Sequence, residues 1–284
     1  MAASDSLSVI FTGDVLLDRG VRPVAEKVGV ERLFAEFTPF FKTADATVIN
    51  LECPITDTVS VVHKKYVFRA DARWAKDLKA AGVTHAAMAN NHTNDQGRRG
   101  LKATAHYLYT NGITPLGYGE TFAEQMGPTV IEKGEVKVAV FNAVMMTVEN
   151  WIPLDKRPGM NQPSTERLVE AVKNYRRAHP SHHIVALLHW GREFQGTPTM
   201  KQRLLARQLT DAGVDVIVGH HPHVIQPMEM MSGVPVFYSL GNFIFDHKRE
   251  DAQNGILLKL TFKNGEKLEI LQKNVKFTLE SLAD

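Results

Sequence analysis

The chain has 284 residues, of which 44% are hydrophobic and 23% are charged, and its formal net charge is +2. Such a chain can bury a sizeable core and has the composition of a globular protein. Because 33 basic and 31 acidic residues nearly balance, the sequence lacks the excess of basic residues that is typical of proteins that bind polyanions. We therefore expect no nucleic-acid partner. The single cysteine, Cys53, excludes an internal disulfide and is expected to be a small packing residue.

No spacer, internal repeat or low-complexity tract interrupts the sequence, which predicts one domain over residues 1–284. No apolar run reaches the length of a membrane span. The N-terminal sequence MAASDSLSVI lacks the basic and apolar regions of a signal peptide. A chain that begins after a removed leader would read the same.

Apolar strands alternate with helical periodicity through the first two thirds of the chain. In the first half, we predict strands at residues 7–11, 46–51, 66–69, 83–89 and 136–142, and helices at 31–41, 72–81 and 98–111. Asn94 and Asp95 are expected to cap the helix at 98–111. The long irregular stretch 143–163 is a candidate lid, because loops of that length are usually functional or mobile.

Strands dominate the last part of the chain. We predict helices at 165–178 and 200–212, a strand opened by His182 and His183, and strands at 215–218 and 234–240. Residues 256–277 read as a hairpin around Asn264-Gly265. The pattern predicts an α/β protein with two packed sheets and helices outside.

Ligand-type side chains follow directly after the predicted apolar strands. They are Asp14, Glu52, Asn91, His189, His221 and His223. Each has an ordinary alternative as a helix cap, a turn residue or a solvated histidine. Open α/β folds, however, place ligands just beyond the carboxyl ends of strands. Six such residues at those positions are poorly explained by chance, so the sequence predicts a shared metal site.

The segment DVIVGHHPHV at residues 215–224 carries the densest part of this pattern. His221 and His223 flank Pro222, and two ligands one residue apart in extended backbone point the same way. They could therefore divide between two adjacent ions. Neutral imidazole is the commonest metal ligand in proteins, which favours a metal site over a solvated turn.

This ligand chemistry indicates borderline divalent ions. Carboxylate, imidazole and one amide suit Mn²⁺, Zn²⁺ or Fe and disfavour a thiolate zinc site. Two ions about 3.5–4 Å apart would hold a phosphoryl oxygen and supply a nucleophile at neutral pH. His92, next to Asn91, can act as a proton donor. The combination favours phosphoester hydrolysis.

The order of these motifs resembles the calcineurin-like metallophosphoesterases, and more closely their CapA-type poly-γ-glutamate capsule synthesis branch. The resemblance rests on Thr12-Gly13-Asp14, Asn50-Leu51-Glu52, Asn90-Asn91-His92 through Gly97, His189-Trp190-Gly191, Gly219-His220-His221-Pro222-His223 and Ser239-Leu240-Gly241-Asn242-Phe243. It implies a four-layer α/β/β/α sandwich. It also implies that Asp14, Glu52 and His223 hold one ion, that Glu52, Asn91, His189 and His221 hold the other, and that His92 is catalytic.

Two positions depart from the wider superfamily. Leu16 stands where Asp-x-His would place a ligand, and Glu52 stands where an aspartate is usual. A solvent molecule or a substitute ligand would then complete the coordination of the first ion, or a single ion is bound. The candidate substitute ligands are Asn242, Asp246 and His247.

Several cations near these motifs are candidate phosphate contacts. Arg19 and Arg192 could bind substrate phosphate as planar forks or form structural ion pairs, and Asn242 is a further candidate substrate contact. Lys64, Lys65 and Arg69 are either phosphate contacts or a solvated edge.

The resemblance implies a metal-dependent phosphatase or phosphodiesterase of the cell envelope, linked to poly-γ-glutamate synthesis. Its substrate would be a phosphorylated small molecule or an envelope polymer precursor, and capsule-synthesis membrane proteins are candidate partners. A non-catalytic accessory role in polymer assembly or export stays open, as does metal-assisted hydrolysis or transfer at the γ-amide. An extracytoplasmic location follows from the resemblance alone, so a cytoplasmic one stays open.

Overall fold

The computed structural model describes residues 6–279. The strands are β1 Ser6–Val15, β2 Ala46–Leu51, β3 His85–Ala87, β4 Thr114–Leu116, β5 Tyr118–Gly119, β6 Thr129–Lys133, β7 Val136–Val144, β8 Gly159–Met160, β9 His183–His189, β10 Val216–His220, β11 Met228–Met231, β12 Val234–Phe237, β13 Asn242–Ile244, β14 Asn254–Lys263 and β15 Glu269–Lys276. The helices are α1 Val21–Val28, α2 Val30–Phe34, α3 Thr38–Phe41, α4 Trp74–Ala80, α5 Gly97–Thr110, α6 Phe122–Met126, α7 Thr165–Ala178 and α8 Met200–Ala212, and a 3₁₀ helix covers Glu250–Gln253.

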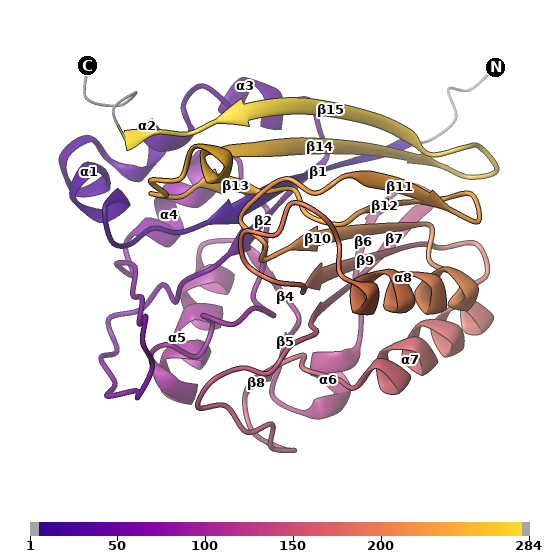
Figure 1. The fold of residues 1–284 in the computed structure, drawn as a ribbon, viewed down its shortest axis with the longest axis horizontal. Coiled ribbons are helices and arrows are strands. Elements are labelled where there is room, and N and C mark those ends of the chain that lie inside the picture. Colours follow the sequence, from indigo (N-terminus) through magenta and orange to yellow (C-terminus); the bar gives the residue numbers. More distant parts are fainter. Residues whose placement is uncertain (1–5, 280–284) are drawn as a thin grey trace.

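Two β-sheets lie at the centre of the protein (Figure 1). The first has the strand order β15-β14-β1-β2-β3-β4, with β13 also paired to β1, and the second has the order β11-β12-β10-β9-β7-β6. Strands β1, β2, β3 and β4 run parallel to one another, as do β7, β9, β10 and β12. The carboxyl ends of four neighbouring strands therefore share one edge in each sheet.

Alternating side chains of the strands build the layers. In β1, Val9 and Phe11 join the core that faces β7, β9 and β10 of the second sheet, whereas Ile10 joins the core beneath the helices. This is the two-residue period of a strand with both faces buried. Full burial of each such side chain stabilises the fold by roughly 1.5–3 kcal/mol.

Helices cover both outer faces of the sheets (Figure 1). Helices α1 to α5 pack on the first sheet, and α7 and α8 pack on the second. The expected α/β/β/α sandwich is confirmed, as are the helices at 165–178 and 200–212 and the C-terminal hairpin. No helix within residues 6–279 is long and apolar enough to cross a membrane.

Two local predictions were wrong. The helix expected over 31–41 is divided into α2 and α3, because Pro39 has no backbone N–H to donate and is tolerated only in the first turn of a helix, here that of α3. The rings of Phe34, Phe37 and Phe41 still share one side and contact Phe243, with centroids 5.6, 4.8 and 6.0 Å away. The strand expected at 66–69 is absent from the described structure, because the amide of Phe68 donates to Asp95 Oδ2 (2.8 Å) instead of to a neighbouring strand.

Candidate metal centre

The predicted ligands meet where the carboxyl ends of strands from both sheets converge. Asp14 lies in β1 opposite Asn50 of β2, and Glu52 follows β2 directly. His189 ends β9 opposite His220, the last residue of β10. The remaining three candidates, Asn91, His221 and His223, lie in the segments that follow β3 and β10. Five of the six side chains are buried and Asn91 is half-buried.

Glu52 is common to two groups of close ligand atoms. One group contains Glu52, His221 and His223, and the other contains Asp14, Glu52 and His189, with all atoms of each group within 4.8 Å of one another. Asn91 joins the second group, because its Oδ1 lies 2.8 Å from His189 Nε2. The structure thus brings all six predicted residues together around Glu52. It groups them differently from what the resemblance implies, because Asp14 lies with His189 and His221 lies with His223.

Unpartnered buried atoms show that these residues fit a cation. Both carboxylate oxygens of Glu52 and Nδ1 of His221 are buried without a hydrogen-bond partner among the described residues. An unsatisfied buried polar group costs roughly 1–3 kcal/mol, and more when it is charged. Divalent ions that accept oxygen and nitrogen donors would satisfy these atoms.

The electrostatics of the cluster also indicate a missing positive charge. Burial and the neighbouring Asp14 raise the pKa of Glu52 well above its usual value. Burial opposes ionisation of His223, yet Glu52 and Asp14 raise its pKa to about 9. Burial and His223 lower the pKa of His221 to about 3, which keeps that imidazole neutral and able to bind a metal.

The backbone of the His221-Pro222-His223 turn differs from the extended conformation expected from the sequence. His221 has φ 96° and His223 has φ 58°, both in the left-handed region. Such conformations cost of order 1–3 kcal/mol for residues other than glycine and concentrate at functional sites. Left-handed geometry, rather than the alternation of a strand, turns both imidazoles toward Glu52.

Two motif glycines allow the strands to approach closely at this edge. A Cβ at Gly219 would lie 2.0 Å from the carbonyl oxygen of Tyr238, and one at Gly13 would lie 2.4 Å from that of Gly241. Any larger residue at these positions would push the histidine turn or Asp14 out of place.

Asparagines orient the ligands. Asn50 Nδ2 donates to Asp14 Oδ1 (2.8 Å). Asn242 Oδ1 lies 2.9 Å from His223 Nδ1, and Asn242 Nδ2 donates to the carbonyl of Ala252 (2.7 Å). These contacts make Asn242 a positioning residue for His223, in the manner of the outer partners that fix metal-binding histidines. His220 Nε2 bonds to the carbonyl of Thr12 (2.7 Å), which occupies that ring nitrogen.

The two candidate arginines have different surroundings. Arg19 forms an ion pair with Asp246 (2.8 Å), which agrees with a structural role for this arginine. The same ion pair occupies Asp246, which was a candidate substitute ligand for the first metal ion. Arg192 is exposed and lines a groove beside the site. Leu16 is fully buried in the helix-facing core and offers no ligand atom.

His92 belongs to a buried network that the sequence did not reveal. Its Nδ1 lies 2.8 Å from Asp95 Oδ2, and Asp95 also pairs with Lys64, whose Nζ donates to the carbonyl of Asn91 (2.7 Å). The predictions of a helix cap for Asp95 and of a solvated edge for Lys64 were wrong, because the two side chains pair with each other in the interior. The phosphate contact of Lys64 stays a prediction. The residues before Lys64 include the exposed Val59 and Val61, so the surrounding sequence did not indicate that the Lys64 side chain is buried.

Solved structures share this fold. The chain superposes on the 5'-nucleotidase precursor of Thermus thermophilus with a TM-score of 0.60 at 17% identity, covering 98% of this chain and 55% of that one. For a putative 5'-nucleotidase of Staphylococcus aureus, determined in complex with alpha-ketoglutarate, the TM-score is 0.62 at 13% identity, with 96% and 55% covered. These similarities show that the chain shares the fold of these two nucleotidase structures.

Residues 8–247 match the family described as bacterial capsule synthesis protein PGA_cap, and the chain belongs to this family. It is 30% identical over 264 residues to the PGA biosynthesis protein CapA of Bacillus subtilis (strain 168), covering 92% of this chain and 69% of that protein. It is also 30% identical over 250 residues to the capsule biosynthesis protein CapA of Bacillus anthracis, with 86% and 61% covered. A Mycobacterium tuberculosis relative, 25% identical over 287 residues with 86% and 76% covered, is named a probable polyglutamine synthesis accessory protein.

Proposed function

We propose that this chain is a metal-dependent phosphoesterase of capsule or cell-envelope polymer synthesis. The observation that carries the proposal is the buried carboxylate of Glu52, which lies between two groups of ligand atoms and has no hydrogen-bond partner among the described residues. Two divalent ions bound there would polarise a phosphoryl oxygen and supply a nucleophile at neutral pH. In this proposal the envelope is the site of action and capsule-synthesis membrane proteins are partners.

The residues have distinct roles in the proposed reaction. Asp14, Glu52, Asn91, His189, His221 and His223 would hold Mn²⁺, Zn²⁺ or Fe. His92, held by Asp95 through Nδ1, would steady the phosphoryl group and protonate the leaving oxygen. The carboxylate of Asp95 fixes the ring orientation, and its charge favours the cationic imidazole when a phosphoryl group is near.

One observation supports the alternative of a non-catalytic accessory component. The buried side chain of Leu16 occupies the position where the wider superfamily has a histidine ligand, so the first ion has one donor fewer. A single ion with a structural role would then be enough to satisfy Glu52.

Removal and restoration of metal tests the two roles. We expect the chelated chain to be inactive toward aryl phosphate mono- and diesters, and we expect Mn²⁺, Zn²⁺ or Fe²⁺ to restore turnover of at least one of them. Metal content is measured in parallel by elemental analysis. Tight metal retention without turnover of either ester in any ion would overturn the phosphoesterase proposal and leave the accessory role.

Replacement of Lys64 by Met should lower the restored activity roughly 10–100-fold, the usual effect of losing a residue that positions a metal ligand. Lys64 holds both Asp95 and the carbonyl of Asn91, so its loss frees His92 and Asn91 together. Lys65→Met is the matched control, because Lys65 is exposed and lies over the ring of Tyr66 (5.1 Å). Steady-state kinetics and metal content are compared, and Lys64→Arg should recover part of the activity. Equal losses in Lys64→Met and Lys65→Met would contradict the positioning role.

A further inference from the structure

A phenylalanine ring contacts each of two imidazoles on which the proposed chemistry depends. The ring centroid of Phe68 lies 4.3 Å from that of His92, and the ring centroid of Phe245 lies 4.7 Å from that of His223. Both phenylalanines are buried. The amide of Phe68 donates to the same oxygen of Asp95 that His92 Nδ1 contacts, so this ring and this imidazole are fixed together. The position of each imidazole therefore depends on the position of one phenylalanine.

The guanidinium of Arg19 contacts both of these phenylalanines. Its Cζ is 5.7 Å from the ring centroid of Phe68 and 5.6 Å from that of Phe245. Both distances are within the roughly 6 Å over which a cation is attracted to an aromatic ring. A continuous row of contacts therefore joins the proposed acid to a metal ligand. We call this row the Arg19 bridge, and its members in order are His92, Phe68, Arg19, Phe245 and His223.

Asp246 holds the central residue of the Arg19 bridge. Arg19 Nη2 lies 2.8 Å from Asp246 Oδ1, and Arg19 Nε donates to Asp246 Oδ2 (3.2 Å). The amide of Gly20 donates to the same Oδ2 (2.9 Å), and a Cβ at Gly20 would lie only 2.8 Å from that oxygen. The carboxylate thus fixes both the side chain of Arg19 and the backbone that follows it.

Stability alone does not account for this arrangement. Arg19 has φ 52°, in the left-handed region that is unfavourable for residues other than glycine. Its side chain is 35% exposed, and exposed ion pairs contribute little to stability. Backbone strain of this kind concentrates where function requires a defined geometry. His92 and His223 come from segments after β3 and β10, in different sheets, so the strands alone do not fix their separation.

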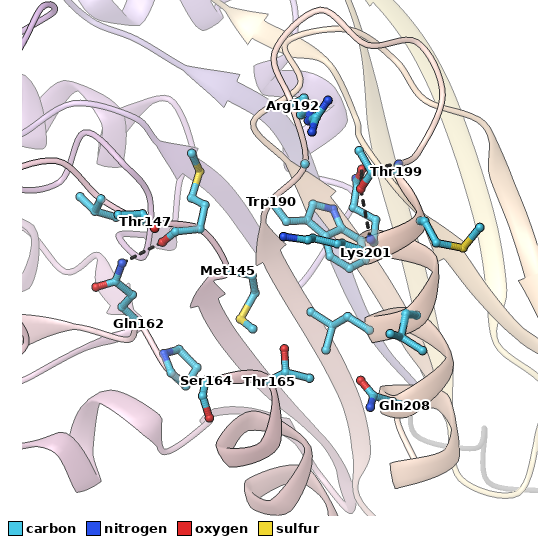
Figure 2. Close-up of a pocket in the computed structure, with 18 of the residues that line it drawn as sticks. Met145, Thr147, Gln162, Ser164, Thr165, Trp190, Arg192, Thr199, Lys201 and Gln208 are labelled. Atoms are coloured by element: carbon cyan, nitrogen blue, oxygen red, sulfur yellow. Dashed lines mark hydrogen bonds between the residues drawn. The ribbon is translucent and has the colours of Figure 1, made fainter.

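Arg192, the other arginine that is a candidate phosphate contact, has different surroundings. It lies on the loop after β9, where it lines the neighbouring groove together with Trp190 and Lys201 (Figure 2). Arg192 is exposed, and its side chain has no ion pair or ring contact among the described residues. Arg192 is thus available to a ligand, whereas the guanidinium of Arg19 is engaged by two rings and a carboxylate.

We propose that Arg19 is a positioning residue that fixes the separation between His92 and His223, acting through Phe68 and Phe245. Asp246 keeps Arg19 in place. The inference rests on the proposed function for the roles of the two imidazoles, and it adds the residue that holds the proposed acid at its distance from the metal ion. A displacement of about 1 Å at a reacting group can lower the rate of an enzyme roughly 10²-fold.

Arg19→Met tests the bridge in the metal-restored chain, because methionine is a flexible side chain without charge. We expect kcat for phenyl phosphate to fall roughly 10–100-fold while KM changes little. Arg19→Lys should recover only part of kcat, since an ammonium lacks the planar fork of a guanidinium. Asp246→Asn should cause a similar loss. The double variant should be no worse than Arg19→Met, as expected for two residues that act as one unit.

Arg22→Met is the matched control. Arg22 also forms an ion pair with an aspartate, Asp18 (2.9 Å), and its Cζ lies 5.4 Å from the ring centroid of Trp74, but it belongs to no contact of the Arg19 bridge. Thermal unfolding verifies that each variant is folded. Equal kcat in Arg19→Met and Arg22→Met would overturn the positioning role. A loss confined to KM would also overturn it and would make Arg19 a direct substrate contact.

A second measurement needs neither metal nor turnover. The imidazole resonances of His92 and His223 are recorded by NMR at one pH in the metal-stripped chain and are assigned through His92→Gln and His223→Gln. Ring currents of Phe68 and Phe245 act on these resonances, so we expect both to shift in Arg19→Met and neither to shift in Arg22→Met. Unshifted resonances in Arg19→Met would overturn the bridge itself. Shifted resonances in a chain without phosphoester turnover would overturn the phosphoesterase proposal alone.

Discussion

His92→Ala should lower kcat for phosphoester hydrolysis by roughly 10²–10⁴-fold, the usual contribution of a positioned acid or base. The imidazole is buried and fixed through Nδ1 to Asp95 at 2.8 Å, which leaves Nε2 to carry a proton. Burial lowers the pKa of His92, while Asp95 opposes this shift. A phosphoryl group adds negative charge near the ring and would favour its cationic form.

The choice of leaving group separates general-acid catalysis from simple loss of structure. Loss of a proton donor should reduce hydrolysis of phenyl phosphate far more than hydrolysis of p-nitrophenyl phosphate, whose leaving group needs little protonation. Metal content should stay equal to that of the parent chain, because His92 lies outside both groups of ligand atoms. His63→Ala, in an exposed position of the nearby loop, is the control. A loss of equal size for both esters, or one explained by lost metal, would exclude the general-acid role.

The convergence of the ligands was predictable because it follows from strand direction. Parallel strands of one sheet end at one edge, so a sequence that places Asp14 and Glu52 after apolar runs already places them near one another, and His189 is placed beside His220 in the same way. The meeting of these two edges depends in addition on how the two sheets pack. The resemblance to CapA-type proteins then supplied the four-layer sandwich, which the family match and the sheet order confirm.

Contacts made by irregular segments were not predictable in this way. Lys64 reaches Asp95 across 31 residues from a stretch without regular structure. Asn242 appeared as a candidate ligand or substrate contact, whereas its bond to His223 depends on the parallel pairing of β13 with β1. The left-handed backbone of His221 and His223 could not be predicted from the residue types either. Sequence patterns indicate the spacing of hydrophobic residues and the residues that favour turns, but they do not indicate backbone strain.

Glu52→Gln should separate stability from metal binding, because the carboxylate has opposite effects on the two. Burial and Asp14 raise the pKa of Glu52, so its ionised form is unfavourable in the metal-free fold. Replacement by the isosteric neutral amide should therefore leave the free energy of unfolding of the chelated chain unchanged or higher, because the cost of burying the charge beside Asp14 exceeds the attraction between Glu52 and His223 (3.5 Å). The same replacement removes the anion shared by both ligand groups and should abolish metal binding.

Thermal unfolding with and without metal measures both effects. Metal at 100 times its Kd stabilises a folded chain by about 2.7 kcal/mol, and each kcal/mol raises Tm by roughly 2–4 °C in proteins of this size. We expect this rise in the parent and in Glu170→Gln, an exposed acid on α7, and none in Glu52→Gln. A metal-dependent rise in Glu52→Gln equal to that of the parent would show that the ions bind elsewhere. If the chelated Glu52→Gln chain were less stable than the chelated parent, the carboxylate would stabilise the fold without a metal. A bound cation would then no longer explain the unpartnered oxygens of Glu52.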